Sequence, residues 1–304
     1  MPVGAREVRF VVVTSDDDYT ADMVVRGLPR DSFVRLDPGR LRPGTLLNAP
    51  APDGPCLVDN RVVPPGASVW WRKPTPARDL TGDEAWAADE TTSLLEGMLR
   101  NATEAGRWMN TPAAVARVRP KPVQLELAHQ VGLAVPQTLV TTDEKEASAF
   151  IAGGPTVVKP TTQRFTEFAP VFRISPGDDL TGIGGALCLL QREVTPKAAD
   201  WRVTLVGDEV FACRITDAEL DWRTRPRECR YSAEDLDEHT AARLRTYRRR
   251  AALNLVAFDL AEAADGTLWF LDANANPEFG FQEIATRAPI TATVARWLQG
   301  DERT

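Results

Sequence analysis

The order of apolar and polar positions predicts a chain of mixed strands and helices that opens with a β-α-β unit. Residues 9–14, RFVVVT, form a run of the kind that makes a buried strand. A short helix is expected over residues 16–27, after an Asp-rich start, and a second strand over residues 32–36. No Gly-x-Gly-x-x-Gly sequence follows the first strand, so the fingerprint of a dinucleotide-binding domain is absent.

Longer stretches with helical periodicity follow this opening unit. Leucines and a methionine between Leu94 and Leu99 fall on one side of a helix predicted over residues 81–108. A break follows at residues 108–112, WMNTP, and we place a domain boundary there, with domains of residues 1–110 and 111–304. Further helices are expected over residues 121–131, 232–255 and 289–298, the second from a capping-box-like start at Ser232 with Asp235.

The most informative stretch is residues 256–283, where two strand-like runs flank Asp265-Gly266, a strong hairpin signal. A two-residue turn there would place Asp259 directly opposite Asp272, with Asn274 on the same face. Two opposed carboxylates should share a proton or hold a cation, and a neighbouring amide oxygen favours Mg²⁺. The competing interpretation is structural, with Asp265 as a turn former and Asp272 as a cap.

A second hairpin is predicted over residues 200–215, around a Gly207-Asp208 turn. Its register stays open in the sequence. A two-residue turn would put Arg202 and Arg214 on opposite faces of the hairpin, whereas a three-residue turn would put them on one face.

Lys159 ends the short apolar strand at residues 156–158, and a Lys in that position needs an anionic partner if it is buried. A phosphate group would provide one. The loop that follows, residues 161–170, contains no glycine, although many phosphate-binding loops use glycine to bring backbone N–H groups close.

Composition narrows the class of protein. The 304 residues carry a net charge of −7, which argues against a nucleic-acid partner. Two histidines and four scattered cysteines make zinc, disulfide or histidine-triad chemistry improbable. No run approaches the roughly 18 apolar residues of a membrane span, and residues 1–10 lack a signal-peptide core, so no membrane association and a cytoplasmic location are expected.

Several motifs resemble those of the graspetide synthetases, the microviridin-type peptide maturases within the ATP-grasp ligases. Residues 270–283, FLDANANPEFGFQE, are similar to the family's Phe-Leu-Glu-x-Asn-Pro-Asn-Gly-Gln ending. Residues 121–138 match its Lys-x-x-Gln-Leu and Gly-Leu-x-Val-Pro-x-Thr pattern, and residues 69–74 and 108–112 resemble its Val-Trp-x-Arg-x-Pro and Trp-x-Asn-x-Pro motifs. Departures are Asp272 in place of Glu, and Ala275, Pro277 and Glu278 within the Asn-Pro loop.

The resemblance implies an α+β ATP-grasp fold behind a β-α-β N-terminal domain, with a central subdomain of about residues 111–190 and a C-terminal subdomain of about 191–304. It also implies roles for individual residues. These are catalysis by Arg202 and Arg214; ATP binding by Lys121, Lys159, Gln191, Glu193 and Val194; Mg²⁺ binding, with two ions, by Asp259, Asp272 and Asn274; and peptide binding by Asp221, Arg223 and Arg225. For Lys121 alone, an ordinary solvated surface lysine is the competing interpretation.

The activity implied by the resemblance is ATP-dependent macrocyclisation of a ribosomally made precursor peptide. A side-chain carboxylate would become an acyl phosphate and then an ω-ester or ω-amide link to a Ser, Thr or Lys side chain. The expected partners are ATP, Mg²⁺, a precursor with an acidic core and a leader segment, and a second copy of the chain in a homodimer.

Two other functions stay open, and both keep the ATP-grasp fold. One is a RimK-like ligase that adds amino acids to a protein or small molecule. The other is a nucleotide- and peptide-binding protein with impaired catalysis, which the departures at Asp272, Ala275 and Pro277 would favour. A purely structural scaffold would leave Lys159 and the opposed Asp pair without an explanation.

Overall fold

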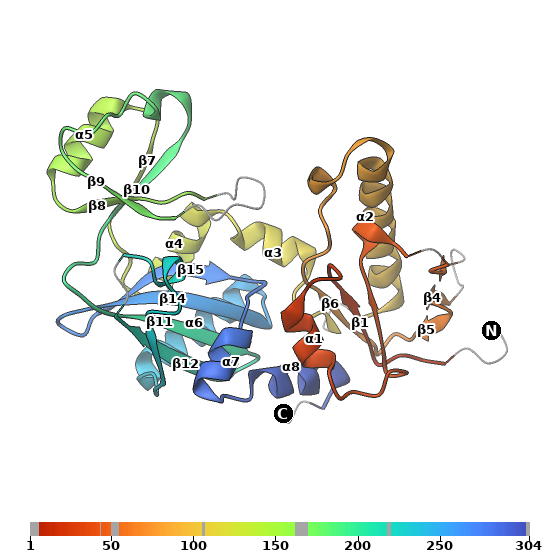
Figure 1. Ribbon diagram of the computed structural model, residues 1–304. Coiled ribbons are helices and arrows are strands. Elements are labelled where there is room, and N and C mark those ends of the chain that lie inside the picture. The colour runs from red at the N-terminus through yellow and green to blue at the C-terminus, as the bar shows by residue number, and fades with distance from the viewer. Residues whose placement is uncertain are drawn as a thin grey trace.

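The computed structural model describes residues 6–42, 44–49, 55–104, 107–161, 170–217 and 220–301. They form three α/β units, with the N-terminal unit beside the C-terminal one and a smaller central unit above the latter (Figure 1). No helix in these ranges is long and apolar enough to cross a membrane.

The N-terminal unit is built on a parallel three-stranded sheet of order β2-β1-β6. Its elements are β1 (Phe10–Val13), α1 (Tyr19–Val25), β2 (Phe33–Leu36) and β6 (Ser68–Trp71), so the β-α-β opening is confirmed. A small antiparallel sheet adds β3 (Leu47–Asn48), β4 (Cys56–Val58) and β5 (Arg61–Val63), and helix α2 (Gly82–Ala102) stands beside it. Helix α2 stops six residues before the predicted end at 108.

The central unit follows two connecting helices, α3 (Pro112–Val118) and α4 (Lys121–Gln130). Its antiparallel sheet has the order β7-β10-β8-β9 and is covered by one helix. The elements are β7 (Thr138–Thr141), α5 (Glu144–Ala152), β8 (Thr156–Val158), β9 (Phe172–Ile174) and β10 (Cys188–Arg192).

The C-terminal unit carries the longest strands, in an antiparallel sheet of order β13-β12-β11-β14-β15. Its strands are β11 (Lys197–Val206), β12 (Glu209–Thr216), β13 (Arg230–Ala233), β14 (Leu255–Ala263) and β15 (Leu268–Asn274). Its helices are α6 (Glu238–Ala251), α7 (Gly280–Thr286) and α8 (Ile290–Gln299), the last close to the predicted 289–298.

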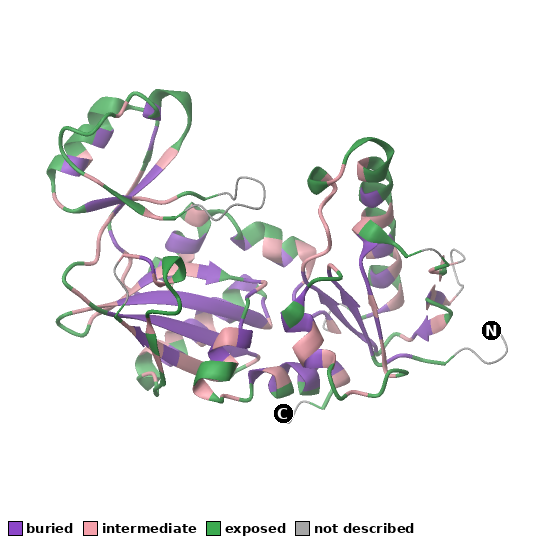
Figure 2. Ribbon diagram, viewed as in Figure 1, coloured by how far each residue is buried: buried purple, intermediate pink, exposed green. Residues whose placement is uncertain are grey.

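The two faces of this sheet have different characters because side chains alternate along a strand. On β11, Trp201, Val203 and Leu205 enter a core with residues of α3, α4 and α6. Asp200 and Arg202 alternate with them along the strand and therefore point to the opposite face. Figure 2 shows that the central strands of this sheet are buried along much of their length.

The β14–β15 hairpin has the predicted Asp pair but not the predicted turn. Its loop has three residues, Ala264 to Gly266, because the Ala263 N–H bonds to the Thr267 carbonyl at 2.9 Å. A β-bulge at Leu271 then shifts the register by one residue and restores the pairing of Asp259 with Asp272. The prediction of the opposed Asp pair was therefore correct, while the two-residue turn on which it was based was wrong.

The structure also corrects the start of one predicted helix and settles the turn of the second hairpin. The helix predicted over residues 232–255 is wrong at its start, because residues 230–233 pair with β12 as an edge strand. Helix α6 begins later, after Asp237, whose carboxylate accepts a bond from the Thr240 N–H at 2.9 Å. The hairpin of β11 and β12 has the two-residue turn, so Arg202 pairs with Cys213 and Arg214 with Trp201.

Candidate active site

A cleft of about 1750 Å³ lies where the three units meet. Its floor is the polar face of β11, β14 and β15, and its far wall comes from loops of the N-terminal unit. Its roof is the segment of residues 191–194 at the end of β10, which we call the hinge. Of the residues expected to act in chemistry or binding, those that line it are Lys121, Lys159, Gln191, Glu193, Val194, Asp221, Arg223, Asp259, Asp272 and Asn274.

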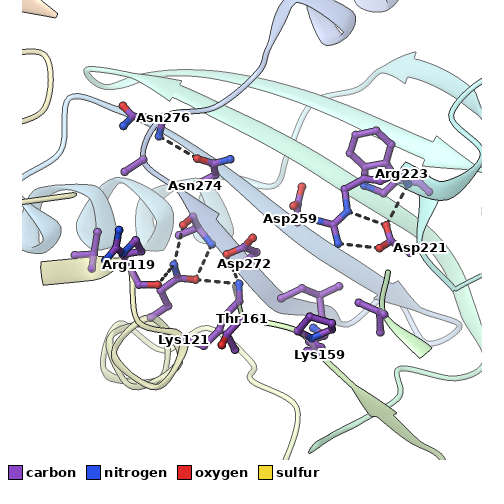
Figure 3. Close-up of a pocket in the computed structure, with 18 of the residues that line it drawn as sticks. Arg119, Lys121, Lys159, Thr161, Asp221, Arg223, Asp259, Asp272, Asn274 and Asn276 are labelled. Atoms are coloured by element: carbon purple, nitrogen blue, oxygen red, sulfur yellow. Dashed lines mark hydrogen bonds and ion pairs between the residues drawn. The ribbon is translucent and has the colours of Figure 1, made fainter. Parts of the chain in front are cut away.

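The floor carries a row of alternating charges that crosses adjacent elements. Arg202 on β11 lies directly opposite Asp259 on β14, and its Nη1 donates to Asp259 Oδ1 at 2.9 Å. Asp259 in turn lies opposite Asp272 on β15. Asp272 pairs with the ammonium of Lys121, at the start of α4. The two acids therefore sit between two cations, and Figure 3 shows them side by side on the sheet.

The start of α4 is fixed to the edge of this sheet by Gln124. Its side-chain amide donates to the Ala273 carbonyl at 3.0 Å and accepts from the Ala273 N–H at 3.1 Å, as a neighbouring strand would. Lys121 lies one helical turn earlier and consequently reaches Asp272. The Lys-x-x-Gln spacing thus has a structural explanation. Gln124 binds helix α4 to β15, and Lys121 brings its ammonium group to Asp272 in the cleft.

Cations surrounding the floor control the ionisation of Asp272. Burial alone would raise its pKa, but Lys121, Arg223 and Lys159 outweigh burial and lower the pKa below the ordinary value. Asp272 is therefore a carboxylate at neutral pH, as a metal ligand must be.

Lys159 is a half-buried cation that faces this floor from β8's end. Burial, reinforced by the charge of Lys121, lowers its pKa to about 8. It makes no ion pair within the described ranges. A lysine held in this state gains most from an anionic ligand, which would restore the charged form.

Asp221 and Arg223 form a bidentate ion pair beside the floor. Arg223 Nε donates to Asp221 Oδ1 and Arg223 Nη2 donates to Asp221 Oδ2, each at 2.8 Å, and both residues line the cleft. Arg225 behaves differently, because it is exposed, forms a 3.5 Å ion pair with Glu228 and is not among the described residues that line the cleft. Its assignment to peptide binding has no support from its position.

The hinge residues present both side chains and backbone to the cleft. Gln191 is 1% exposed, and its Nε2 donates to Thr138 Oγ1 at 2.9 Å while its Oε1 is buried without a hydrogen-bond partner in the described residues. Glu193 is held by Arg173 at 2.7 Å, and its N–H already bonds to the Pro155 carbonyl. An adenine amino group would supply the donor that Gln191 Oε1 lacks.

Arg202 and Arg214 are separated by the sheet, which corrects the expectation that both face a nucleotide. Arg214 Nε bonds to Glu262 Oε2 at 2.7 Å, and Trp201 Nε1 reaches the same oxygen at 2.9 Å. The two-residue turn of the hairpin puts this cluster on the face away from Asp259. Arg214 is therefore a structural residue in this geometry.

The floor fits a magnesium ion in its donor set. Asp259 and Asp272 offer two opposed carboxylates, and Asn274 adds an amide oxygen, which now accepts from the Asn276 N–H at 2.9 Å. No group of three or more His, Cys, Asp or Glu side chains suited to a metal occurs in the described ranges. An ion here would therefore depend on phosphate oxygens or water for its remaining ligands, as Mg²⁺ commonly does.

Residues of the N-terminal unit also reach the site, and the sequence analysis assigned them no role. Arg72 and Lys73, in the Val-Trp-x-Arg-x-Pro stretch, both contact Glu278 in the loop after β15. The resemblance pointed to this stretch, but nothing in the sequence pairs residues about 200 positions apart.

No protein-family model matches the chain, and no curated protein matches it. Solved structures do. Macrocyclase MdnC bound with precursor peptide MdnA, from Microcystis aeruginosa MRC, is similar over 96% of this chain and 99% of its own, with 21% identity and a TM-score of 0.81. The ATP-grasp ligase PsnB, complexed with a variant of its minimal precursor, Mg and ADP, is similar over 98% and 100%, with 24% identity and a TM-score of 0.80.

A more distant likeness is to a RimK domain ATP-grasp protein from Sphaerobacter thermophilus DSM 20745, with 16% identity, coverage of 96% and 98%, and a TM-score of 0.60. The agreement with MdnC and PsnB includes the N-terminal unit, because nearly the whole of both chains is matched. The chain therefore has the ATP-grasp fold, in the three-part form of these peptide-modifying ligases.

Proposed function

We propose that this protein is an ATP-dependent ligase that closes rings in a ribosomally made precursor peptide. The observation that carries the proposal is the opposed pair of Asp259 and Asp272 in a cleft lined by Lys121, Lys159 and Arg223. Fixed cations around a metal-binding acid pair suit a triphosphate, whose transfer depends on positioning and on neutralising charge.

In this proposal the nucleotide occupies the cleft between the hinge and the floor. Gln191 and the backbone near Glu193 and Val194 would contact the base, while Lys159 and Lys121 would contact phosphate oxygens. Asp259, Asp272 and Asn274 would hold Mg²⁺, two ions if the resemblance holds, which supplies charge neutralisation and orientation of the phosphates when bound. Arg202 lies beside this set and would offset charge that develops on the transferred group.

The reaction would proceed in two displacements. A peptide Asp or Glu carboxylate attacks the γ-phosphorus, so that the bond to the β-phosphate oxygen breaks and ADP leaves. The resulting acyl phosphate is attacked by a Ser or Thr hydroxyl or a Lys amine, which loses a proton as inorganic phosphate departs. Each ring closed in this way removes one water from the peptide. Asp221 and Arg223, which line the cleft, would contact the peptide.

The RimK-like alternative is less favoured by the comparisons, because the RimK domain protein has a TM-score of 0.60 against 0.81 for MdnC. The pseudoenzyme alternative draws on the altered loop after Asp272. The departure at Asp272 itself supports it less, because a carboxylate still lies opposite Asp259, as a metal site requires. Homodimer formation, an acidic core in the peptide and a cytoplasmic location stay predictions.

ADP formation separates these alternatives. The protein is incubated with ATP and Mg²⁺ in three parallel reactions, with the precursor peptide encoded beside its gene, with free amino acids, or with neither. Release of ADP that requires the precursor supports the peptide ligase, and release that requires amino acids supports the RimK-like reaction. Nucleotide binding without release in any reaction would contradict the enzyme and leave a binding protein.

A further inference from the structure

The loop that follows the acid pair, residues 275–278, is held mainly by residues from outside its own unit. Asn110, at the domain boundary, donates to the Ala275 carbonyl at 2.6 Å. Asn276, Pro277 and Glu278 are all held by Arg72 of the N-terminal unit. One residue from more than 200 positions earlier in the chain thus binds three consecutive residues of this loop.

The contacts of Arg72 use both its backbone and its guanidinium group. Its carbonyl accepts from Asn276 Nδ2 at 2.8 Å, its Nη1 donates to the Pro277 carbonyl at 2.7 Å, and its Nη2 lies 2.9 Å from Glu278 Oε1. Its Nε donates to Asp18 Oδ2 at 2.6 Å. The Arg72 side chain is 0% exposed and that of Asp18 is 2% exposed, so this ion pair is fully buried.

Removing one partner of a buried guanidinium group leaves a charge that is costly to bury. Such a group therefore holds its partners in place. Asp18 is kept ionised, since Arg72 and Thr14 outweigh the effect of burial and lower its pKa. Glu278 is likewise kept ionised by Arg72 and Lys73. Arg72 is therefore locked between a carboxylate of its own unit and the loop.

The loop that Arg72 holds also makes hydrogen bonds to residues of the cleft floor. The Asn276 N–H donates to Asn274 Oδ1, and Asn274 is the amide oxygen in the magnesium donor set. At the other end, the Glu278 carbonyl accepts from Arg202 Nη2 at 3.2 Å, and Arg202 binds Asp259. Both ends of the segment that Arg72 holds therefore contact residues of the cleft floor, Asn274 at one end and Arg202 at the other.

We propose that Arg72 is a positioning residue for the metal site, through which the N-terminal unit sets the orientation of Asn274 and the loop behind it. Glu278, which departs from the pattern of the resembling family, is the loop's half of this contact. The role in metal binding rests on the proposed function, whereas the restraint on the loop does not.

The test uses the full chain with Arg72→Lys and Glu278→Gln. Arg35→Lys is the matched control, because Arg35 also binds a carboxylate, Asp22, and the carbonyls of Ser15 and Asp16 in the same unit but does not touch the loop. Hydrogen exchange of the segment 274–280 is measured without nucleotide. ADP affinity is then measured with Mg²⁺ and with a chelator.

We expect Arg72→Lys to speed hydrogen exchange of segment 274–280. Mg²⁺ should then raise ADP affinity about tenfold less in this variant than in the unmodified protein, a difference equal to one charge-assisted hydrogen bond. Glu278→Gln should act in the same direction by roughly threefold and keeps a side chain that is half exposed, so the fold is preserved. Arg35→Lys should change neither quantity.

Unchanged exchange in both loop variants would overturn the proposal. Faster exchange with an unchanged gain from Mg²⁺ would also overturn it, because Arg72 would then be only a structural contact. If the unmodified protein shows no gain from Mg²⁺, the proposed function fails, and the positioning role at a metal site is overturned with it. Hydrogen exchange of segment 274–280 would in that case test only whether Arg72 restrains the loop.

Discussion

Within the described ranges Asp259 and Asp272 each form one ion pair, and the two cations involved are not equivalent. Arg202 and Asp259 are both largely buried, with side chains 6% and 13% exposed, whereas Lys121 and Asp272 lie nearer the open cleft. A buried pair resists separation, because an uncompensated buried charge is costly. We therefore expect Lys121 to be the partner that moves to phosphate and Arg202 to stay near Asp259.

The two arginines of the β11–β12 hairpin provide a direct test of which face is catalytic. Arg202→Gln should lower peptide-dependent ADP formation by about 10²-fold or more, as loss of a preorganised charge in an active site does. Arg214→Gln should leave the rate within about twofold, because it faces Glu262 on the other side of the sheet. The steady-state rate of ADP formation, measured for both variants with the same peptide, shows which arginine is needed for catalysis. Equal losses in both variants would contradict the observed register.

Lys159 predicts a pH dependence of nucleotide binding. In the free protein its pKa is lowered to about 8, so above that pH it is mostly neutral. A bound phosphate favours the charged form, which raises the pKa in the complex, so binding takes up a proton and ADP affinity falls as pH rises through about 8. Calorimetry without Mg²⁺, in two buffers of different ionisation enthalpy, measures this uptake. Lys159→Arg, which stays charged, should abolish it, and persistence in that variant would assign the proton to another group.

Among single residues, the hairpin pattern predicted the acid pair with Asn274, the apolar strand singled out Lys159, and the family resemblance alone pointed to Lys121, Asp221 and Arg223. All of them line the cleft. Motifs with fixed spacing on one hairpin or one helix start are visible to sequence reasoning, because local geometry sets their distances. Arg214 shows the limit of this reasoning. Its face depended on a turn length that the sequence left open.

The β14–β15 hairpin shows how an element can reach the expected pairing by another route. Its three-residue loop alone would pair Asp259 with Leu271 and turn Asp272 to the other face, and the bulge at Leu271 restores the pairing. Bulges of this kind leave little trace in a single sequence. The strand at residues 230–233 is a similar case, since its partner β12 converts a helix-like pattern into an edge strand.

Two glycines in different elements should respond oppositely to the same change. Gly266 closes the loop of the β14–β15 hairpin with φ +84°, where a side chain costs about 1 kcal/mol even though no atom lies within 4 Å. Gly97 lies inside α2 and is also free of neighbours within 4 Å, so Ala there should stabilise the protein by about 0.5–1 kcal/mol. Urea unfolding of Gly266→Ala and Gly97→Ala measures both. A stabilised Gly266→Ala would contradict the left-handed turn.

Across the whole molecule, the N-terminal unit and the C-terminal unit share a core. Phe10 and Trp70 of the parallel sheet pack in one cluster with Leu255 of β14 and with Val294 and Leu298 of α8. The boundary that we predict at residue 110 is therefore crossed by buried contacts, and it stays a prediction. This shared core also keeps Arg72 against the loop after β15.

This shared core predicts how the molecule unfolds. Leu298→Ala should destabilise the protein by about 2–5 kcal/mol, because Leu298 is fully buried in the cluster. Leu94→Ala, at a position 63% exposed on α2, should cost less than about 0.5 kcal/mol. Unfolding followed by tryptophan fluorescence and by circular dichroism should coincide in both variants. Two separate transitions in Leu298→Ala would mean that the N-terminal unit is stable without α8.

The most direct test of the account is the mass of a precursor peptide after incubation with this protein, ATP and Mg²⁺. We predict that the peptide loses one water for each ring, that ADP forms in step, and that Asp272→Asn abolishes both changes because the acid pair is broken. An unmodified peptide, with ATP bound but not consumed, would contradict the assignment of this cleft as the active site of a peptide ligase.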